Sequence, residues 1–195
     1  MNELKEPKVL VAAPIYEGKH YIFPIWYKLV TNLSYPNYDL MIVDNSKTIS
    51  YSTKLRRLGY RFIHHVNRGG NSRYGIAAAS ETIRQRAIDG GYDYIMFIES
   101  DLLPPKDIIQ RLMKHKLRIV GATYEIGIKG NKNVPRKPLI YKETIVDGNL
   151  KLEIEKPEDG YALLNTGLHK TPACGFGSTL IHKSIFSKYS FKHRS

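Results

Sequence analysis

Short apolar runs alternate with amphipathic segments along the first 123 residues of the chain. The runs have the length and composition of strands and cover residues 8–13, 38–43, 60–64, 95–98 and 118–123. A continuous apolar run is typical of a strand covered on both faces of a sheet. Residues 22–33, 76–87 and 108–113 space their apolar side chains as amphipathic helices do. Alternating strands and helices predict a parallel α/β sheet with right-handed crossovers.

The pattern changes after residue 124. Residues 127–137 are polar and aperiodic, which predicts a loop, as the glycine-rich segment 67–71 also does. Two alternating runs, 144–146 and 150–154, flank Asp147-Gly148, which is a strong hairpin signal. We therefore predict a mostly parallel sheet flanked by helices, with a small antiparallel hairpin appended to it. A length of 195 residues suits a single domain, 1–195.

The net charge of +12 indicates an anionic partner without naming it. Nucleic acid, an anionic membrane surface and phosphorylated substrates are all compatible with this charge, so peripheral membrane contact stays open. No apolar run approaches the roughly 18 residues that span a bilayer, and the first residues lack the apolar core of a signal peptide. We expect a cytoplasmic protein without a transmembrane segment. Cys174 is the single cysteine, which excludes an internal disulfide and a cysteine-rich zinc site.

Two acids follow the apolar run 95–98 directly. Side chains at positions i and i+2 of an extended strand point the same way, so Glu99 and Asp101 can converge. Two carboxylates with room for water and substrate oxygens suit Mg²⁺ or Mn²⁺ held together with a diphosphate. The alternative is a strand that runs into a polar turn.

Polar residues also end the first two predicted strands. Ligands of open α/β sheets bind beyond the carboxyl ends of the strands, where Tyr16 and Asp44 fall. Tyr16 could stack on a base, and Asp44 could accept a hydrogen bond from a base or ribose. Arg73, at the start of a predicted helix, could hold a phosphate. The structural alternatives are a core cap, a turn residue and a solvated arginine.

Motifs of other nucleotide-binding classes are missing from the sequence. The chain has no GxxxxGK[ST] loop, and no GxGxxG follows the first predicted strand. The glycine-rich LxxGxGxR-like loop of a sugar-nucleotide nucleotidyltransferase is also missing. These absences argue against P-loop, dinucleotide-binding and nucleotidyltransferase enzymes.

Five segments, taken in order, resemble the GT-A fold of nucleotide-sugar glycosyltransferases, nearest the family-2-like group. They are residues 12–17, the "VVDDGS"-like 42–46, the arginine-bearing helix start 73–77, the DxD-like 97–101 and the "G-x-G-x-x-L-I"-like 173–181. The resemblance implies metal-dependent, inverting transfer of a sugar from a UDP- or GDP-linked donor to an acceptor hydroxyl. The acceptor would be a protein glycan or another anionic glycoconjugate. Some archaeal viruses encode small proteins of this group.

The same resemblance implies a set of site residues. The donor would be bound by Ala13, Pro14, Tyr16, Glu17, Asp44, Asn45, Ser46, Arg73, Ser100, Gly175, Phe176 and Gly177. The metal, Mn²⁺ or Mg²⁺, would be held by Asp101 and Glu99, with His182 as a further candidate ligand. Gly175 and Gly177 would let the backbone approach the sugar closely.

Two departures from the family pattern qualify this assignment. Glu99 stands where the family has an aspartate. The acidic pair that supplies the catalytic base is expected shortly after the glycines, where this chain ends, so we expect a chain truncated at its C-terminus. Glu158 and Asp159 form an acidic pair, but they precede the glycines. A catalytically inactive nucleotide-sugar-binding protein and a basic nucleic-acid-binding module are the alternative functions.

Overall fold

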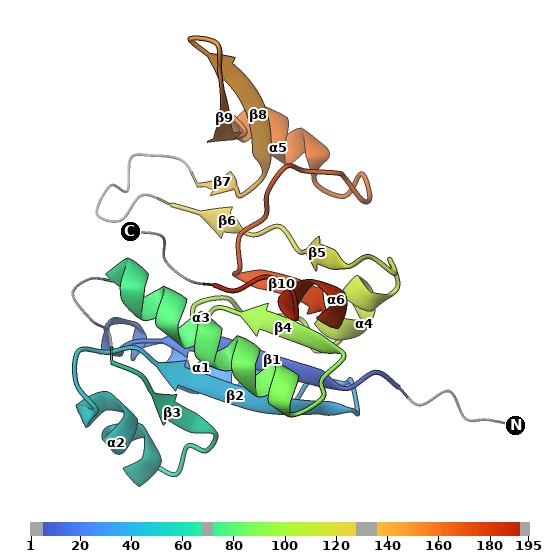
Figure 1. Ribbon diagram of the computed structural model, residues 1–195. Coiled ribbons are helices and arrows are strands. Elements are labelled where there is room, and N and C mark those ends of the chain that lie inside the picture. Colours follow the sequence, from blue (N-terminus) through green and yellow to red (C-terminus); the bar gives the residue numbers. More distant parts are fainter. Residues whose placement is uncertain (1–5, 68–71, 128–135, 192–195) are drawn as a thin grey trace, which may run out of the picture.

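A six-stranded sheet forms the centre of the molecule in the computed structural model, which describes residues 6–67, 72–127 and 136–191 (Figure 1). Its strand order is β3-β2-β1-β4-β10-β5. The strands are β1 (Val9–Ile15), β2 (Tyr38–Asp44), β3 (Ile63–His65), β4 (Tyr94–Ile98), β5 (Ile119–Gly121) and β10 (Ser178–His182). β3, β2, β1 and β4 run parallel, whereas β10 is antiparallel to both β4 and β5. The predicted mostly parallel α/β sheet is confirmed.

Helices cover both faces of this sheet because its central strands are apolar on both sides. Along β1, Val9 and Val11 belong to one buried cluster, whereas Leu10 and Ala12 belong to the other. The first cluster is completed by α1 (Phe23–Val30), α2 (Ser50–Arg57) and α4 (Ile108–Met113). The second is completed by α3 (Ser72–Asp89) and α6 (Lys183–Phe186). Figure 1 shows α3 lying along the face of the sheet opposite α1.

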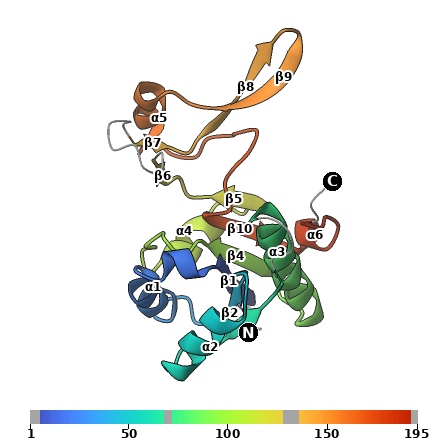
Figure 2. The same ribbon diagram turned by 90° about the vertical axis from the view of Figure 1, so that its left-hand side faces the viewer.

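The remaining elements form the predicted appendage, which projects from the sheet beyond β5 (Figures 1 and 2). It consists of β6 (Glu125–Ile126), β7 (Lys137–Pro138), β8 (Tyr141–Val146), β9 (Asn149–Ile154) and α5 (Pro157–Leu163). β8 and β9 pair antiparallel around Asp147 and Gly148, both at positive φ, which confirms the hairpin. One face of the hairpin is apolar and exposed, with Ile145 opposite Leu150.

The sequence prediction lacks α2, α5 and β10, and also the short elements β6, β7 and α6. In α2, Tyr51 and Leu55 are the buried apolar side chains of an otherwise polar octapeptide, so its periodic signal is weak. The helix 76–87 is confirmed within α3, but Ile76 is exposed and Gly75 takes its place in the buried stripe. The two predicted loops fall largely on residues 68–71 and 128–135, outside the described residues.

Among the described residues, no helix has the length and apolar character needed to cross a bilayer.

Candidate active site

The carboxyl ends of β1, β2 and β4 meet at one edge of the sheet, because the three strands are parallel. Ile15, the last residue of β1, pairs in register with Asp44, the last residue of β2. The segments that follow are tied together by two hydrogen bonds. The Asn45 amide donates to the Ile15 carbonyl at 2.8 Å, and the Glu17 amide donates to Ser46 Oγ at 3.0 Å. The structure thus brings two of the predicted polar sets together.

A short 3₁₀ helix, η1 (Glu17–Lys19), connects these sets to the acids after β4. Lys19 Nζ forms an ion pair with Asp101 Oδ2 across 82 residues of sequence. Partial burial acts to lower the pKa of Lys19, but the hydrogen bond and charge of Asp101 outweigh it and raise that pKa. All three predicted polar sets therefore lie at a single edge.

The two acids lie in a turn and not in the pleat of a strand, which corrects the prediction. β4 ends at Ile98, and the Leu102 amide donates to the Glu99 carbonyl at 3.0 Å, closing a turn over residues 99–102. Ser100 is buried in that turn, whereas the residues on either side of it are exposed, and its contact with the donor stays a prediction. Glu99 has exposed surface as a whole residue, but the protein around its carboxyl group partly desolvates that group and so raises the pKa of Glu99. The nearby charge of Asp101 raises this pKa further.

This pair of carboxylates fits a magnesium or manganese site. Such ions are commonly held by one or two carboxylates, with the other positions filled by water and substrate phosphate oxygens. Among the described residues, no group of three or more His, Cys, Asp and Glu side chains could hold a metal by itself. The ion pair with Lys19 shows independently that a cation is accommodated at Asp101.

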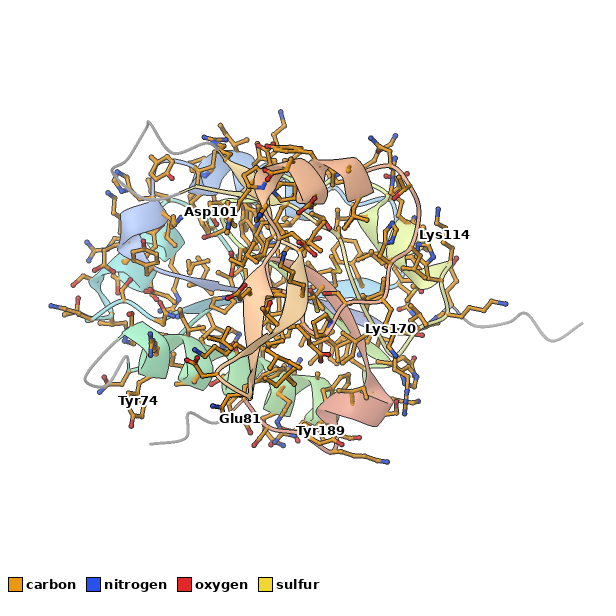
Figure 3. All side chains as sticks on the ribbon, turned by 90° about the horizontal axis from the view of Figure 1, so that it is seen from above. Tyr74, Glu81, Asp101, Lys114, Lys170 and Tyr189 are labelled. Carbon is orange, nitrogen blue, oxygen red and sulfur yellow. The ribbon has the colours of Figure 1, made fainter. Side chains whose placement is uncertain are left out.

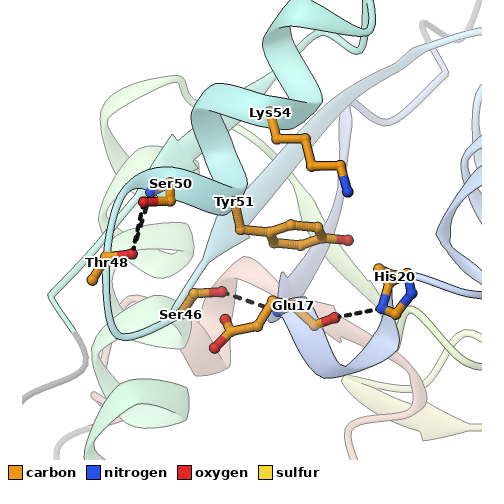
Figure 4. Close-up of a pocket in the computed structure, with 7 residues that line it drawn as sticks. All are labelled: Glu17, His20, Ser46, Thr48, Ser50, Tyr51 and Lys54. Atoms are coloured by element: carbon orange, nitrogen blue, oxygen red, sulfur yellow. Dashed lines mark hydrogen bonds between the residues drawn. The ribbon is translucent and has the colours of Figure 1, made fainter.

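A pocket of about 330 Å³ opens beside the ends of β1 and β2 (Figure 4). Its lining residues are Glu17, His20, Ser46, Thr48, Ser50, Tyr51 and Lys54. The side chain of Tyr51 is buried, and its hydroxyl has no hydrogen-bond partner among the described residues. Burial, with the charge of Asp44 adding to it, raises the pKa of Tyr51 to about 12, so the hydroxyl remains a donor at neutral pH. Tyr51 lines the pocket, and a buried donor without a partner beside a pocket is suited to a polar ligand.

Asp44 has a structural role in place of the predicted direct contact with a base. Its side chain has no exposed surface. Oδ1 accepts a hydrogen bond from the Ser46 amide at 2.9 Å, and Oδ2 accepts one from Ser52 Oγ at 2.5 Å. Asp44 therefore holds the start of α2 against the end of β2, and so positions the wall of the pocket that carries Tyr51.

Four other predicted donor-binding residues have different surroundings. Ala13 is fully buried in the core, Pro14 is partly exposed, and Asn45 is buried in the turn after β2. Tyr16 folds its ring over Gly18, since a Cβ at Gly18 would lie 2.3 Å from Tyr16 Cε2. Tyr16 is partly exposed, and it is close enough to Lys19 for the two groups to interact electrostatically.

Arg73 occupies the first turn of α3, as predicted, with an exposed side chain. β3 runs parallel to β2 and leads into α3, so α3 begins at the edge of the sheet where β2 ends. A helix start and a cation at that edge are compatible with phosphate binding. The phosphate role of Arg73 remains a prediction.

The glycines of the 173–181 segment make room for an aromatic ring. A Cβ on Gly175 or on Gly177 would lie 2.4 Å from an atom of the Tyr124 ring system, so both positions are filled by Tyr124 in place of the predicted sugar. The Gly177 carbonyl accepts a hydrogen bond from the Glu99 amide at 2.8 Å. Phe176 packs against Phe97, with ring centroids 5.3 Å apart, which explains its presence without a ligand. The segment therefore packs against the turn of residues 99–102, which carries the two acids, and holds it by this hydrogen bond.

His182 lies at the wrong end of the sheet to bind the metal. It pairs in register with Tyr94, the first residue of β4, whereas the acids follow the last residue. Five residues of strand separate the two ends, and His182 Nδ1 is engaged by Ser184 at the start of α6. β10 runs antiparallel to β4, which no local sequence pattern indicates, and this direction places His182 at the opposite end of the sheet from the acids.

Glu158 and Asp159 are also remote from the acid-bearing turn. Both lie in the first turn of α5, which packs on β7 in the appendage. Figures 1 and 2 place α5 on the far side of β6 from the central sheet. The geometry does not support either acid as the catalytic base.

Replacing Gly177 by alanine should destabilise the protein by about 1–3 kcal/mol, because the new Cβ overlaps the Tyr124 ring. Urea unfolding of Gly177→Ala, Tyr124→Ala and the double variant measures this coupling. We expect most of the destabilisation caused by Gly177→Ala to disappear when Tyr124 is also replaced by alanine. Gly127→Ala is the control, since its Cβ would meet Arg136 Cγ at an ordinary 3.7 Å. An equal cost of Gly177→Ala in both backgrounds would show that Tyr124 is not the neighbour responsible.

Sequence reasoning missed Lys19, Tyr51 and Tyr124. Lys19 stands two residues after Glu17, so its position near the predicted edge of the sheet could have been predicted from the sequence. Its ion pair with Asp101 could not, because Asp101 is 82 residues away in the chain. Tyr51 follows the second polar set by five residues, in a helix that the pattern did not indicate. Tyr124 ends the predicted strand 118–123, and its position over the glycines depends on the placement of β10 beside β5.

Comparison with solved structures finds similarity to glycosyltransferases. The mannosyltransferase PcManGT from Pyrobaculum calidifontis, solved with GDP-Man and Mn²⁺, is 20% identical with a TM-score of 0.42, over 55% of this chain and 32% of that one. TarS 1–349 from S. aureus, solved with UDP, is 15% identical with a TM-score of 0.44, over 66% of this chain and 38% of that one. This chain thus spans well under half the length of these proteins. No curated protein sequence is significantly similar to it.

The family comparison covers nearly the whole chain. Residues 11–190 match the model described as glycosyl transferase family 2. This range begins at the third residue of β1 and includes every later element up to α6, together with the segments that follow β1, β2 and β4. The chain belongs to glycosyl transferase family 2.

Proposed function

We propose that this protein transfers a sugar from a nucleoside-diphosphate sugar to an acceptor hydroxyl, with Mn²⁺ or Mg²⁺ as cofactor. The observation that carries the proposal is the location of two complementary sites at one edge of the sheet. One is the polar pocket that contains the unpartnered Tyr51 hydroxyl, and the other is the pair formed by Glu99 and Asp101. Family membership supports the same reaction class.

The geometry suggests how the donor would lie. Its nucleoside would enter the pocket beside β1 and β2, where Tyr51 can donate a hydrogen bond and Ser46 offers a hydroxyl. Its diphosphate would extend toward Asp101, along η1. A donor of this kind fits the chain's positive charge, because the diphosphate is anionic.

The residues of the chain then have distinct tasks. Asp101 and Glu99 would hold the divalent cation, and Asp44 positions the pocket wall through Ser46 and Ser52. When bound, the metal supplies Lewis-acid stabilisation of the charge that develops on the leaving diphosphate. Direct displacement by the acceptor hydroxyl inverts the configuration at the sugar carbon.

Thermal-shift measurements with UDP-, GDP- and dTDP-sugars, each with and without Mn²⁺ at constant ionic strength, test the proposal. We expect the sugar nucleotides of one nucleobase to raise the melting temperature of the protein, and Mn²⁺ to increase that rise. Tyr51→Phe is the sharpest companion variant, because it removes the unpartnered hydroxyl at nearly constant shape. The free variant should be at least as stable as the wild type, since an unsatisfied buried group is lost. Its donor-induced shift should correspond to about 2–13-fold weaker binding, the loss of one hydrogen bond.

Two outcomes would contradict the proposal. One is that no nucleotide sugar stabilises the protein while an oligonucleotide binds with steep salt dependence, which would favour a nucleic-acid-binding module. The other is an unchanged donor-induced shift in Tyr51→Phe, which would place the nucleoside outside this pocket.

A further inference from the structure

Lys19 places a permanent positive charge at the acid-bearing edge. Its Nζ contacts Asp101 Oδ2, and the two side chains are 29% and 34% exposed. η1 holds Lys19 at this position through backbone hydrogen bonds, of which the Lys19 amide donates one to the Tyr16 carbonyl at 3.0 Å. The contact therefore joins the β1 loop to the β4 turn at the point where a metal would bind.

The ammonium group of Lys19 faces a defined set of charged and titratable groups. Asp101 is its direct partner, and Glu99, Tyr16 and Tyr21 are close enough for their charges to interact with it. Lys19 offsets the repulsion between the two carboxylates, since its charge opposes that of Asp101 at Glu99. In the absence of a divalent ion, Lys19 thus performs part of the work that the ion would do.

We propose that Lys19 is a built-in counter-cation that a divalent metal must displace from Asp101, so that Lys19 sets the metal affinity of the site. This inference rests on the proposed function, because it concerns the same metal. An ammonium group and a divalent ion cannot share one carboxylate oxygen without strong mutual repulsion. The flexible four-carbon stem of lysine allows the ammonium to move away when the metal arrives.

The consequence is an affinity for Mn²⁺ that is weaker than two free carboxylates would provide. Displacement of Lys19 breaks a partly buried ion pair, and the ammonium stays tethered nearby, where it still repels the metal. Once a diphosphate is also bound, its oxygens offer the displaced ammonium a new partner. Metal binding would therefore be weak in the free protein and stronger in the presence of donor.

Calorimetric titration with Mn²⁺ alone, at constant ionic strength and without nucleotide, tests this role on the full chain. Lys19→Met removes the charge and keeps most of the side-chain volume. We expect it to lower the Kd for Mn²⁺ about two- to fivefold, the size expected when a competing ion pair near the surface is removed. Lys19→Arg, which keeps the charge, should stay near the wild-type value.

Lys114→Met is the matched control. Lys114 is exposed after α4, and Figure 3 shows it well apart from Asp101, so this variant removes one positive charge at a distance. Its Kd for Mn²⁺ should remain near that of the wild type, since exposed charges beyond about 10 Å are largely screened. If Lys114→Met lowers the Kd for Mn²⁺ as much as Lys19→Met does, the effect arises from net charge alone and the proposal is overturned.

Unchanged or weaker Mn²⁺ binding in Lys19→Met would also overturn it, as would the absence of saturable Mn²⁺ binding in every variant. These failures are distinguishable from failure of the proposed function. Donor-induced stabilisation of the wild type is measured separately, so a protein that binds a nucleotide sugar while Lys19→Met leaves the Mn²⁺ affinity unchanged loses this inference alone.

Discussion

Asp101→Ala should reduce the rate of sugar transfer at least about 100-fold and abolish the Mn²⁺-dependent part of the donor-induced thermal shift. The reason is that Asp101 is the exposed carboxylate of the acid-bearing turn that already holds a cation. A Lewis-acid metal contributes several kcal/mol to stabilisation of the transition state, and about 1.4 kcal/mol corresponds to a tenfold change in rate. The measurement is transfer with the donor identified by thermal shift, at saturating and at limiting Mn²⁺.

The fold of this variant should be preserved, because Asp101 and its partner Lys19 are both partly exposed and the ion pair between them adds little to stability. Asp107→Ala is the matched control, since it removes another accessible aspartate that also pairs with a cation, Arg111. It should retain both transfer and the Mn²⁺-dependent shift. An Asp101→Ala protein that keeps the complete shift would mean that the metal binds elsewhere.

Asp44→Ala should lower the free energy of unfolding by about 3 kcal/mol or more. The carboxylate is fully buried, and its removal leaves the Ser46 amide and the Ser52 hydroxyl without their acceptors. Each such buried polar group costs about 1–3 kcal/mol when left unpaired, and the cavity adds to the loss. Urea unfolding followed by circular dichroism measures the change. Asp44→Asn should lose less, because its amide can still bond Ser52.

The control for this variant lies on the same strand. Asp39 is near the other end of β2, where its exposed carboxylate accepts a hydrogen bond from the Tyr92 hydroxyl at 2.6 Å. Asp39→Ala should cause a much smaller loss of stability, since water can replace the lost contacts. If Asp44→Ala unfolds as easily as Asp39→Ala, Asp44 is not the structural support inferred here. A direct contact between Asp44 and the nucleoside would then be the better interpretation.

The parallel part of the sheet was predictable because its signals are local and strong. β1, β4 and residues 40–43 of β2 are continuous apolar runs, because these positions are buried on both faces of the sheet. Parallel strands end at a common edge, so the meeting of Glu17, Ser46 and Asp101 followed from the same pattern. The hairpin was predictable because Asp147-Gly148 suits the positive φ angles of its turn.

The errors share one cause, which is that long-range pairing leaves no local trace. β10 enters the sheet antiparallel between β4 and β5, and this placement moves His182 to the opposite edge and brings Gly177 beside Glu99. α2 and α5 are short and polar, and their few buried contacts come from neighbours distant in sequence. Tyr51 and Tyr124 entered the site through such neighbours.

The sequence by itself determined the fold class, the family and the edge of the sheet at which chemistry would occur. Hydrophobic periodicity encodes the fold class and the edge, since each strand must bury its own side chains whatever its partners are. The resemblance to the family rests on the five motif segments between residues 12 and 181. Tertiary structure alone decided what each polar residue does at that edge. In the tertiary structure Asp44 holds α2 against β2, Tyr124 packs over Gly175 and Gly177, and Lys19 forms an ion pair with Asp101. These contacts depend on distances between segments that are far apart along the chain, so the local sequence does not reveal them.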